Sequence, residues 1–389
     1  MDEHRSVRSI IHGHVDDFMF GGREGDVLHD QLMQKIQQKF TWGTWEYSEF
    51  IQCGIHVRQT SDFGIELQQT KFIDEIEEIS ISRDRSRHEE LQTTDDEKRA
   101  LRGLLGSLSW LCGETCFLFS VDVNFLITSI PVSTVSDINK ANKLVRDVKK
   151  WKHLKYKIHP FPEHETLELA AWTDAAWANR PNGKDSTEGI FIGMTDSKLR
   201  QGQETDVTPI YWRSGKIERT CRSPACAETM ASLNGEDDLT YLRVLWNEMR
   251  GFPIDTRNVD AAAIPTPGFV ITDARNLYDK MNRATPVIKG AEKRSDIEAL
   301  SLRENLERGQ GQLLWVNGNA ILSNSLTKPH EKSQMMLYVK MNFRWKVVYD
   351  EAMMSGKKRT KMGLGAHTDT QSQNLQQTND ITEEGAVSS

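Results

Sequence analysis

The sequence predicts an α/β fold with a central mixed β-sheet over residues 165–330. The order of its apolar segments indicates strand, hairpin, strand, helix, strand and helix. The length of 389 residues, with 38% hydrophobic residues, allows a sizeable core and two or three domains. Three acids, Asp174, Glu228 and Asp273, each adjoin one of the apolar segments. These observations predict a sheet protein that carries acids on its regular elements.

The three acids define a candidate metal site. Asp174 lies at or near the end of a predicted strand that starts at 169, Glu228 lies in a predicted helix at 225–249, and Asp273 is the last residue of a predicted strand at 269–273. Taken singly, such an aspartate is more often a turn residue, and such a glutamate more often faces solvent. Brought together, the three carboxylates would form an oxygen-only site suited to Mg²⁺.

The first 97 residues carry shorter elements. Asp16 and Asp17 lie between apolar residues and before two glycines, which predicts a β-hairpin with both acids at its tip. Adjacent buried carboxylates repel each other, so a solvated turn is the alternative to a cation site. The other expected elements are a helix at 26–39, a strand pair at 50–57 and 64–69, a helix from 71 to 79, and a polar linker at 83–97.

Residues 98–157 are predicted to be mainly helical. Helical spacing of apolar residues at 98–128 indicates two packed helices. The stretch 140–157 is basic, and on a helix several of its cations would share a face that could follow a phosphate backbone. A solvated face explains the same pattern. The candidate nucleic-acid-binding residues here are Lys143, Arg146, Lys149 and Lys150.

Composition limits the remaining classes of protein. No apolar run approaches the ~20 residues that cross a bilayer, so we expect no membrane partner. The formal net charge of −7 argues mildly against non-specific nucleic-acid binding, although local basic stretches matter more. Five scattered cysteines predict reduced thiols rather than a zinc site. We therefore expect a cytoplasmic protein, with the nucleus as the alternative, and a disordered tail at 356–389.

Eight segments together resemble a known family, the Copia-type long-terminal-repeat retrotransposon polyproteins. The resemblance covers roughly residues 10–330 and keeps the family's order of motifs. It concerns the C-terminal part of the polyprotein, in which the end of the reverse transcriptase precedes a ribonuclease H domain. The segments are His14-Val15-Asp16-Asp17, 50–69, 104–111, Thr173-Asp174-Ala175-Ala176-Trp177-Ala178, 184–189, Trp212-Arg213-Ser214-Gly215-Lys216, Ala227-Glu228-Thr229-Met230-Ala231 and Leu326-Thr327-Lys328-Pro329.

The resemblance implies a domain order and an activity. The domains are a reverse-transcriptase palm remnant with its strand pair at 1–82, a helical thumb or connection at 83–160, a ribonuclease H-like domain at 165–330, a helical extension at 331–355 and the tail. The implied activity is two-metal hydrolysis of the RNA strand of RNA–DNA hybrids by Asp174, Glu228 and Asp273. The ion would be Mg²⁺, with Mn²⁺ as an alternative, and Lys328 would contact the nucleic acid. Other parts of the polyprotein are further expected partners.

Two departures from the family weaken parts of this expectation. Asn324 occupies the position of the family's fourth active-site carboxylate, so we expect weaker binding of the second metal ion. His14 replaces the usual aromatic residue of the polymerase box, and no earlier palm carboxylate accompanies Asp16 and Asp17. We therefore expect no DNA synthesis by this chain alone. The alternative to an enzyme is a decayed transposon relic that binds nucleic acid or has no activity.

Overall fold

The computed structural model describes residues 7–162, 166–181, 183–283, 288, 292–316, 318–329 and 331–347. All structural statements concern these residues. The predicted disordered tail at 356–389 lies outside them. No helix within them is both long and apolar enough to cross a membrane.

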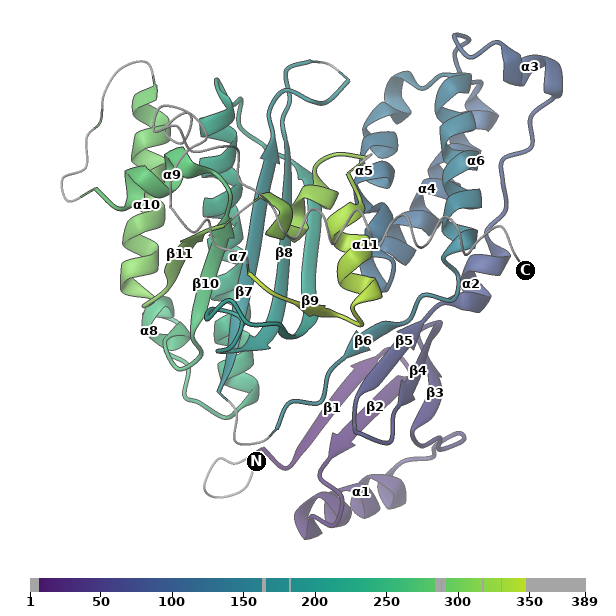
Figure 1. Cartoon of the computed structure of the whole chain (residues 1–389). Coiled ribbons are helices and arrows are strands. Elements are labelled where there is room, and N and C mark those ends of the chain that lie inside the picture. Colours follow the sequence, from purple (N-terminus) through teal and green to yellow (C-terminus); the bar gives the residue numbers. More distant parts are fainter. Residues whose placement is uncertain are drawn as a thin grey trace, which may run out of the picture. The chain divides into compact units, whose positions relative to one another are not determined.

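A six-stranded mixed sheet organises the region from residue 167 onward (Figure 1). Its strand order is β11-β10-β7-β8-β9-β12. Strands β7, β8 and β9 are antiparallel neighbours, whereas β10 and β11 run parallel to β7. The predicted mixed sheet is confirmed. The strands are β7 (Leu167–Ala176), β8 (Thr187–Asp196), β9 (Thr205–Lys216), β10 (Gly268–Thr272), β11 (Gln312–Trp315) and β12 (Arg344–Trp345).

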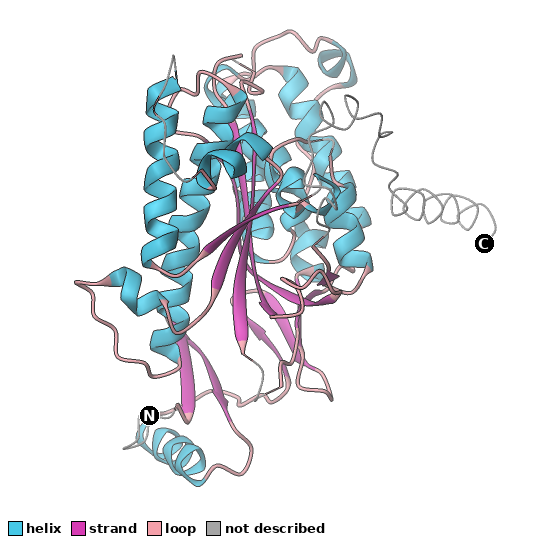
Figure 2. Ribbon diagram, turned by 60° about the vertical axis from the view of Figure 1, so that its left-hand side comes forward, coloured by secondary structure: helices cyan, strands magenta, loops and turns pink. Residues whose placement is uncertain are grey.

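Helices flank this sheet on both faces, as Figure 2 shows. Successive residues of a strand point to opposite faces, so Ala171 and Ile190 belong to one buried cluster and Trp172 and Phe191 to the other side. The Phe191 ring packs 5.7 Å from that of Tyr338 on the second face. The face with Ala171 is covered by α7 (Pro224–Met249), α9 (Arg275–Met281) and α10 (Lys293–Arg308), with α8 (Val259–Ala263) at their end. The face with Trp172 is covered by the 3₁₀ turns η1 (Phe117–Phe119) and η5 (Leu322–Leu326) and by α11 (Ser333–Lys340).

Helix α7 approaches β7 closely because a glycine faces the strand. A Cβ on Gly235 would lie only 2.4 Å from Thr173 Cγ2. One turn earlier, Ser232 Oγ lies 3.0 Å from Thr173 Oγ1. Glu228, Ser232 and Gly235 have helical spacing on one face of α7. The contact that brings α7 against β7 therefore also brings Glu228 toward the end of that strand.

The N-terminal region begins with the predicted hairpin, formed by β1 (Ser9–His14) and β2 (Asp17–Gly22). Helix α1 (Val27–Lys39) also matches its prediction. The predicted strand at 50–57 is wrong, because it is two strands, β3 (Glu49–Gln52) and β4 (Ile55–Gln59). Cys53 and Gly54 both adopt positive φ between them and make a two-residue hairpin turn. Strands β3, β4, β5 (Ile65–Gln68) and β6 (Tyr156–Ile158) form a four-stranded sheet.

The predicted linker at 83–97 is also wrong in part. It contains α3 (Arg83–Arg87) and the start of α4 (Asp95–Glu114). Thr94 and Glu97 form a capping box, in which each side chain accepts the other's backbone N–H, and this fixes the start of α4. The two packed helices predicted at 98–128 are confirmed by α4 and α5 (Ser120–Ser129). Helix α2 (Thr70–Glu75) is shorter than predicted, and α6 (Val135–Lys150) carries the basic stretch.

The predicted helical extension at 331–355 is only partly helical among its described residues. Helix α11 is followed by the short strand β12, which pairs with β9 at the edge of the central sheet. The buried Trp345 of β12 donates its indole N–H to the Ala320 carbonyl at 3.2 Å. Two residues of strand give no periodic signal in a sequence, which explains the error. The domain division itself stays a prediction.

Candidate metal site at the end of the central sheet

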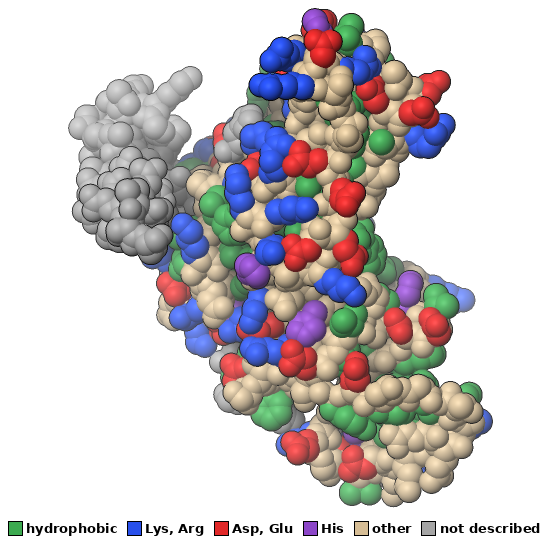
Figure 3. All heavy atoms as spheres, turned by 90° about the vertical axis from the view of Figure 1, so that its right-hand side faces the viewer, with side chains coloured by type: hydrophobic (Ala, Val, Ile, Leu, Met, Phe, Trp, Pro, Cys, Tyr) green, Lys and Arg blue, Asp and Glu red, His purple; other side chains and the backbone are tan. Residues whose placement is uncertain are grey.

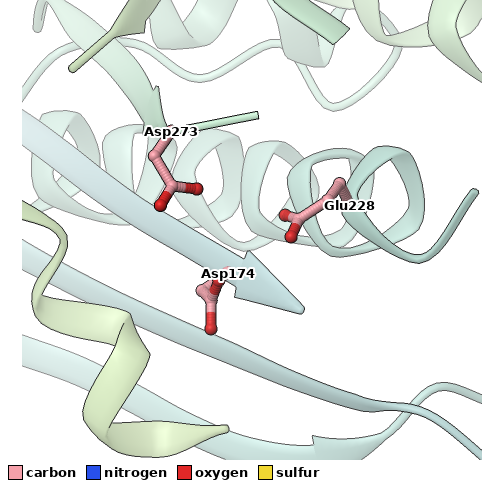
Figure 4. A group of neighbouring side chains, drawn as sticks. All are labelled: Asp174, Glu228 and Asp273. Atoms are coloured by element: carbon pink, nitrogen blue, oxygen red, sulfur yellow. The ribbon is translucent and has the colours of Figure 1, made fainter. Parts of the chain in front are cut away.

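Asp174, Glu228 and Asp273 converge at one end of the central sheet (Figure 4). One carboxylate oxygen from each lies within 4.8 Å of the other two. They come from β7, from the start of α7 and from the residue after β10; the sequence predicts this order of strand, helix and strand, but places Asp273 within its strand. The structure therefore brings together the three acids that were proposed to share a metal site.

Asp174 is the most buried of the three, with 3% of its surface exposed. It lies opposite Gly189 of β8. A Cβ on Gly189 would lie 2.6 Å from the Ser323 carbonyl oxygen, so this glycine lets η5 pack onto the sheet beside Asp174. Thr327, directly after η5, has one hydroxyl proton, which it shares between two acceptors, Asp174 Oδ2 and the Asn324 carbonyl oxygen, the latter at 3.0 Å. These contacts fix the orientation of the Asp174 carboxylate.

Glu228 projects from the first turns of α7. Pro224 opens this helix, and Ser223 caps it by accepting the Cys226 N–H at 3.2 Å. Glu228 Oε2 is buried and has no hydrogen-bond partner. A buried carboxylate oxygen without a partner is rare in a folded protein and calls for a proton or a cation.

Asp273 leaves the sheet at the end of β10. The Trp315 indole N–H donates to its backbone carbonyl at 2.9 Å, which ties it to β11. The Arg275 guanidinium lies 4.6 Å from the centre of the Trp315 ring. A Cβ on Gly318 would lie 3.0 Å from Asp273 Oδ2, so the 3₁₀ turn η4 (Gly318–Ala320) also approaches the carboxylate. Asp273 is thereby positioned by its backbone and its neighbours together.

Crowding and burial perturb all three carboxyl groups. Burial, then the charge of Asp174, raises the pKa of Asp273 to about 6. Burial, followed by the charges of Asp174 and Asp273, raises the pKa of Glu228 well above its usual range. Burial also raises the pKa of Asp174, although the Thr327 hydroxyl opposes this. Without a cation, the site therefore favours protonated carboxyl groups.

The three residues fit a divalent oxygen-binding cation. Carboxylates are preferred ligands of Mg²⁺, and a bound cation would supply the partner that Glu228 Oε2 lacks. It would also offset the repulsion between the carboxylates, which adds to burial in raising the pKa values of Glu228 and Asp273. The group is the one set of three or more acids, histidines or cysteines in the described part of the chain whose ligand atoms lie this close.

Asn324 lies in η5, next to the cluster rather than in it. Its side-chain N–H donates to the Gly318 carbonyl at 3.1 Å, and 8% of its surface is exposed. The amide thus holds the 3₁₀ turn η4, which approaches Asp273. An aspartate at this position could not donate that hydrogen bond, but would add a fourth negative charge.

Lys328 lies beside the acids. Although burial opposes it, the charge of Asp174, followed by contact with Glu331, raises the pKa of Lys328. Its Nζ lies 3.2 Å from Glu331 Oε2. We expected Lys328 to contact nucleic acid, and this stays a prediction. The position of Lys328 next to the acids is compatible with such a contact.

The basic residues expected to bind nucleic acid along α6 are partly neutralised. Lys143 and Lys150 contact Asp147 at 2.6 and 2.8 Å, and Arg146 pairs with Glu78. Figure 3 shows cations and acids interspersed on the side of the molecule where α6 lies in Figure 1. The role predicted for these residues, which include Lys149, is not tested by this arrangement. Because these acids offset part of their positive charge, the basic residues of α6 attract a phosphate less strongly than their number in the sequence suggests.

Asp16 and Asp17 are not part of the acid cluster. Both are exposed at the tip of the β1–β2 hairpin, where Val15 adopts a φ of 55°. The predicted hairpin with acids at its tip is therefore confirmed as a local structure. The structure gives these acids a solvated turn, which was the alternative to a cation site.

The sequence indicated no role for Thr327, Trp315 or Gly235 in the site. Thr327 contacts an acid 153 positions away along the chain. Gly235 is needed only because Thr173 faces it across the interface between α7 and β7. No local pattern could show either contact, because both depend on how distant segments pack.

Comparison of the sequence with protein-family models and with curated proteins finds no match. Solved structures show weak likenesses. A ribonuclease H1 isolated from compost is 15% identical, over 41% of this chain and 91% of the other, with a TM-score of 0.27. The N-terminal ribonuclease H domain of a Mycobacterium tuberculosis protein is 13% identical, over 44% and 99%, with a TM-score of 0.29. Foamy viral protease-reverse transcriptase in complex with an RNA/DNA hybrid is 12% identical, over 79% and 36%, with a TM-score of 0.42.

The chain thus spans about a third of the foamy viral protein's length. These low TM-scores leave the assignment of function to the chain's own residues. The strand order of the central sheet and the convergence of the three acids are the observations that bear on it.

The raised pKa of Asp273 predicts how pH affects stability. The folded, metal-free chain binds this proton more tightly than the unfolded chain, so the carboxyl lowers stability as the pH rises from 3.8 through about 6. In a chelator at pH 8, Asp273→Asn should therefore raise the free energy of unfolding by about 1–3 kcal/mol, and at pH 4 this gain should largely vanish. Denaturant unfolding at both pH values measures the effect.

Asp279→Asn is the control, since Asp279 is an exposed acid of α9 that pairs with Arg275 at 2.7 Å. It should give no gain at pH 8. An Asp273→Asn chain less stable than the parent at pH 8 would show that its carboxylate is not crowded.

Proposed function

We propose that this chain is the C-terminal part of a Copia-type retrotransposon polyprotein and that it hydrolyses the RNA strand of RNA–DNA hybrids. The approach of the Asp174, Glu228 and Asp273 carboxylates to within 4.8 Å is the observation that carries the activity. The order of the eight sequence segments supports the family. The products would carry 5′-phosphate and 3′-hydroxyl ends.

The residues of the site have separate tasks in this proposal. Asp174, Glu228 and Asp273 would hold Mg²⁺, with Mn²⁺ as a substitute. Ions held by these residues would supply the chemistry of a two-metal site, in which a water is activated and the charge on the leaving 3′ oxygen is stabilised. Thr327 keeps the Asp174 carboxylate in one orientation through its hydroxyl. Lys328 places a positive charge next to the acids, where a phosphate of the hybrid can approach.

Choice of the hybrid over other duplexes would rest on its shape. A duplex with an RNA strand has a wide, shallow minor groove that displays 2′-hydroxyl groups. Other segments of the polyprotein are further proposed partners. A second candidate function, a relic that binds hybrid without cutting it, is favoured by the amide of Asn324 at the fourth acid position.

Cleavage of a hybrid tests the proposal directly. With Mg²⁺, the purified chain should cut the RNA strand of an end-labelled hybrid and should spare single-stranded RNA and double-stranded DNA of the same sequence. Asp174→Asn should lower the rate about 100-fold or more, because it removes a charged metal ligand.

Asp279→Asn, purified in the same way, should keep the parent rate to within about twofold, since an exposed ion pair contributes little. Equal cleavage by the parent and by Asp174→Asn would show a contaminating nuclease. Binding of the hybrid without cleavage would favour the relic.

Restoring an acid at position 324 should increase the activity. Asn324→Asp adds a negative charge beside the cluster, so it should raise the cleavage rate several-fold when Mg²⁺ is limiting and less when Mg²⁺ is saturating. Asn282→Asp adds the same charge at an exposed position at the end of α9 and should change neither rate. Equal rates for Asn324→Asp and the parent at limiting Mg²⁺ would refute a role for this position.

A further inference from the structure

Trp177 is an exposed aromatic residue close to the acid cluster. It follows Asp174 by three residues, at the end of β7, and 45% of its surface is exposed. Other large aromatic side chains of the same sheet are less exposed: Trp172 and Phe191 are 0% and Trp345 is 4% exposed, and Tyr211 and Trp212 are partly buried. Trp177 is thus more exposed than these aromatic residues of the sheet, and it lies near the end of the strand that carries Asp174.

The Trp177 ring is held in place by a hydrogen bond to the segment before α7. Its indole N–H donates to the Cys221 carbonyl at 2.9 Å. Cys221 belongs to a buried apolar cluster with Ala227 and Met230 of α7, and Ala175 of β7 packs against this cluster. The ring is thus anchored on the segment that leads into α7, the helix that carries Glu228.

The backbone after Trp177 is fixed as well. Ala178 adopts a φ of 50°, which a residue with a side chain rarely adopts. Its N–H donates to Ser186 Oγ at 3.0 Å. A ring whose position is set in advance loses little conformational entropy on binding, which favours affinity.

The distance from the acids suits a neighbouring nucleotide. Three residues of extended chain span about 10 Å, and each base step of a duplex rises about 3.4 Å. The backbone of Trp177 therefore lies no more than about 10 Å from that of Asp174, which corresponds to about three base steps.

A cation accompanies the ring. Arg222 directly follows Cys221, is exposed, and within the described residues has no ion pair or side-chain hydrogen bond. Its guanidinium is free to contact a phosphate. An aromatic ring with an adjacent unpaired arginine is a combination suited to a nucleic-acid strand.

We propose that Trp177 is a substrate-binding residue, whose ring packs against a sugar in the minor groove of an RNA–DNA hybrid near the cleaved bond, while Arg222 contacts an adjacent phosphate. The identity of the substrate rests on the proposed function. The contact of the ring with a nucleic-acid strand rests on the position, exposure and anchoring of Trp177. The alternative is that Trp177 has a purely structural role, in which its indole N–H only satisfies the Cys221 carbonyl.

Three variants separate these roles. Trp177→Ala removes both the ring and the N–H, whereas Trp177→Phe keeps a ring and removes the N–H. Trp110→Ala is the matched control, because Trp110 is 43% exposed on α4, a helix that packs against α5 and α6. Thermal unfolding of each variant shows whether it is folded.

Binding is measured with full-length chains that also carry Glu228→Gln, so that the hybrid is not cut. Trp177→Ala should raise the Kd for hybrid about 10-fold, in keeping with the loss of one aromatic contact with a nucleotide. Trp177→Phe should stay within about threefold of the parent, and Trp110→Ala should not change the Kd. Equal losses in Trp177→Phe and Trp177→Ala would show that the N–H anchor matters and the ring does not, and would overturn the proposal.

Fluorine NMR of chains labelled with fluorotryptophan gives a readout that a structural role would not move. The Trp177 signal is assigned by its absence in Trp177→Phe, a variant that should fold even if Trp177→Ala does not. Addition of hybrid should shift this signal and leave that of Trp110 in place. An unmoved Trp177 signal with bound hybrid, or no binding of hybrid at all, would overturn the proposal.

The outcomes also separate this proposal from the enzymatic one. A shifted Trp177 signal in a chain that never cuts hybrid would support the binding residue and refute the hydrolase. Cleavage by the parent chain with an unmoved Trp177 signal would support the hydrolase and refute the role of Trp177 in binding.

Discussion

The acid cluster depends on how closely α7 can approach β7. At the contact, Gly235 faces Thr173 with no room for a side chain, since a Cβ would lie 2.4 Å from Thr173 Cγ2. Glu228 lies on the same face of α7, two turns earlier, so a wider separation would withdraw it from Asp174. The packing of a glycine against a threonine thus sets the distance between two carboxylates.

This arrangement places like charges close together at a buried or partly buried site, where water screens them poorly. Burial raises the pKa values of all three acids, and one oxygen of Glu228 has no partner. The surrounding core, which includes Leu169 and Val270 of the sheet, supplies the stability that offsets this cost. A site that is unfavourable when empty and charged gains most from a bound cation, which gives the cluster a physical reason to bind metal ions.

Patterns of apolar and polar residues within short segments predicted the individual strands and helices that carry the acids. The three acids were found because each adjoins an apolar segment long enough to identify as a strand or helix. The start of α4 was missed because the polar composition of 83–97 predicted a linker, whereas the helix is fixed there by the capping box of Thr94 and Glu97. The turn at Cys53 and Gly54 was missed because the apolar run on both sides reads as one strand.

Long-range contacts could not be predicted in this way. Thr327 reaches Asp174 only because η5 returns to the sheet, and Glu78 neutralises Arg146 from a segment 68 residues earlier. The basic stretch of α6 therefore looked more strongly charged in the sequence than it is in the folded chain. Short strands such as β6 and β12 exist because a neighbouring strand offers hydrogen bonds, and their own residues give little sign of them.

Calorimetric titration with Mg²⁺ tests the central claim, that Asp174, Glu228 and Asp273 form one metal site. At pH 6, close to the pKa of Asp273, binding should release protons, so the measured heat should vary with the ionisation enthalpy of the buffer. Asp174→Asn should weaken binding about 10-fold or more, and Asp279→Asn should leave it unchanged. Equal Mg²⁺ affinity in the parent and in Asp174→Asn, or no binding by either, would contradict the account.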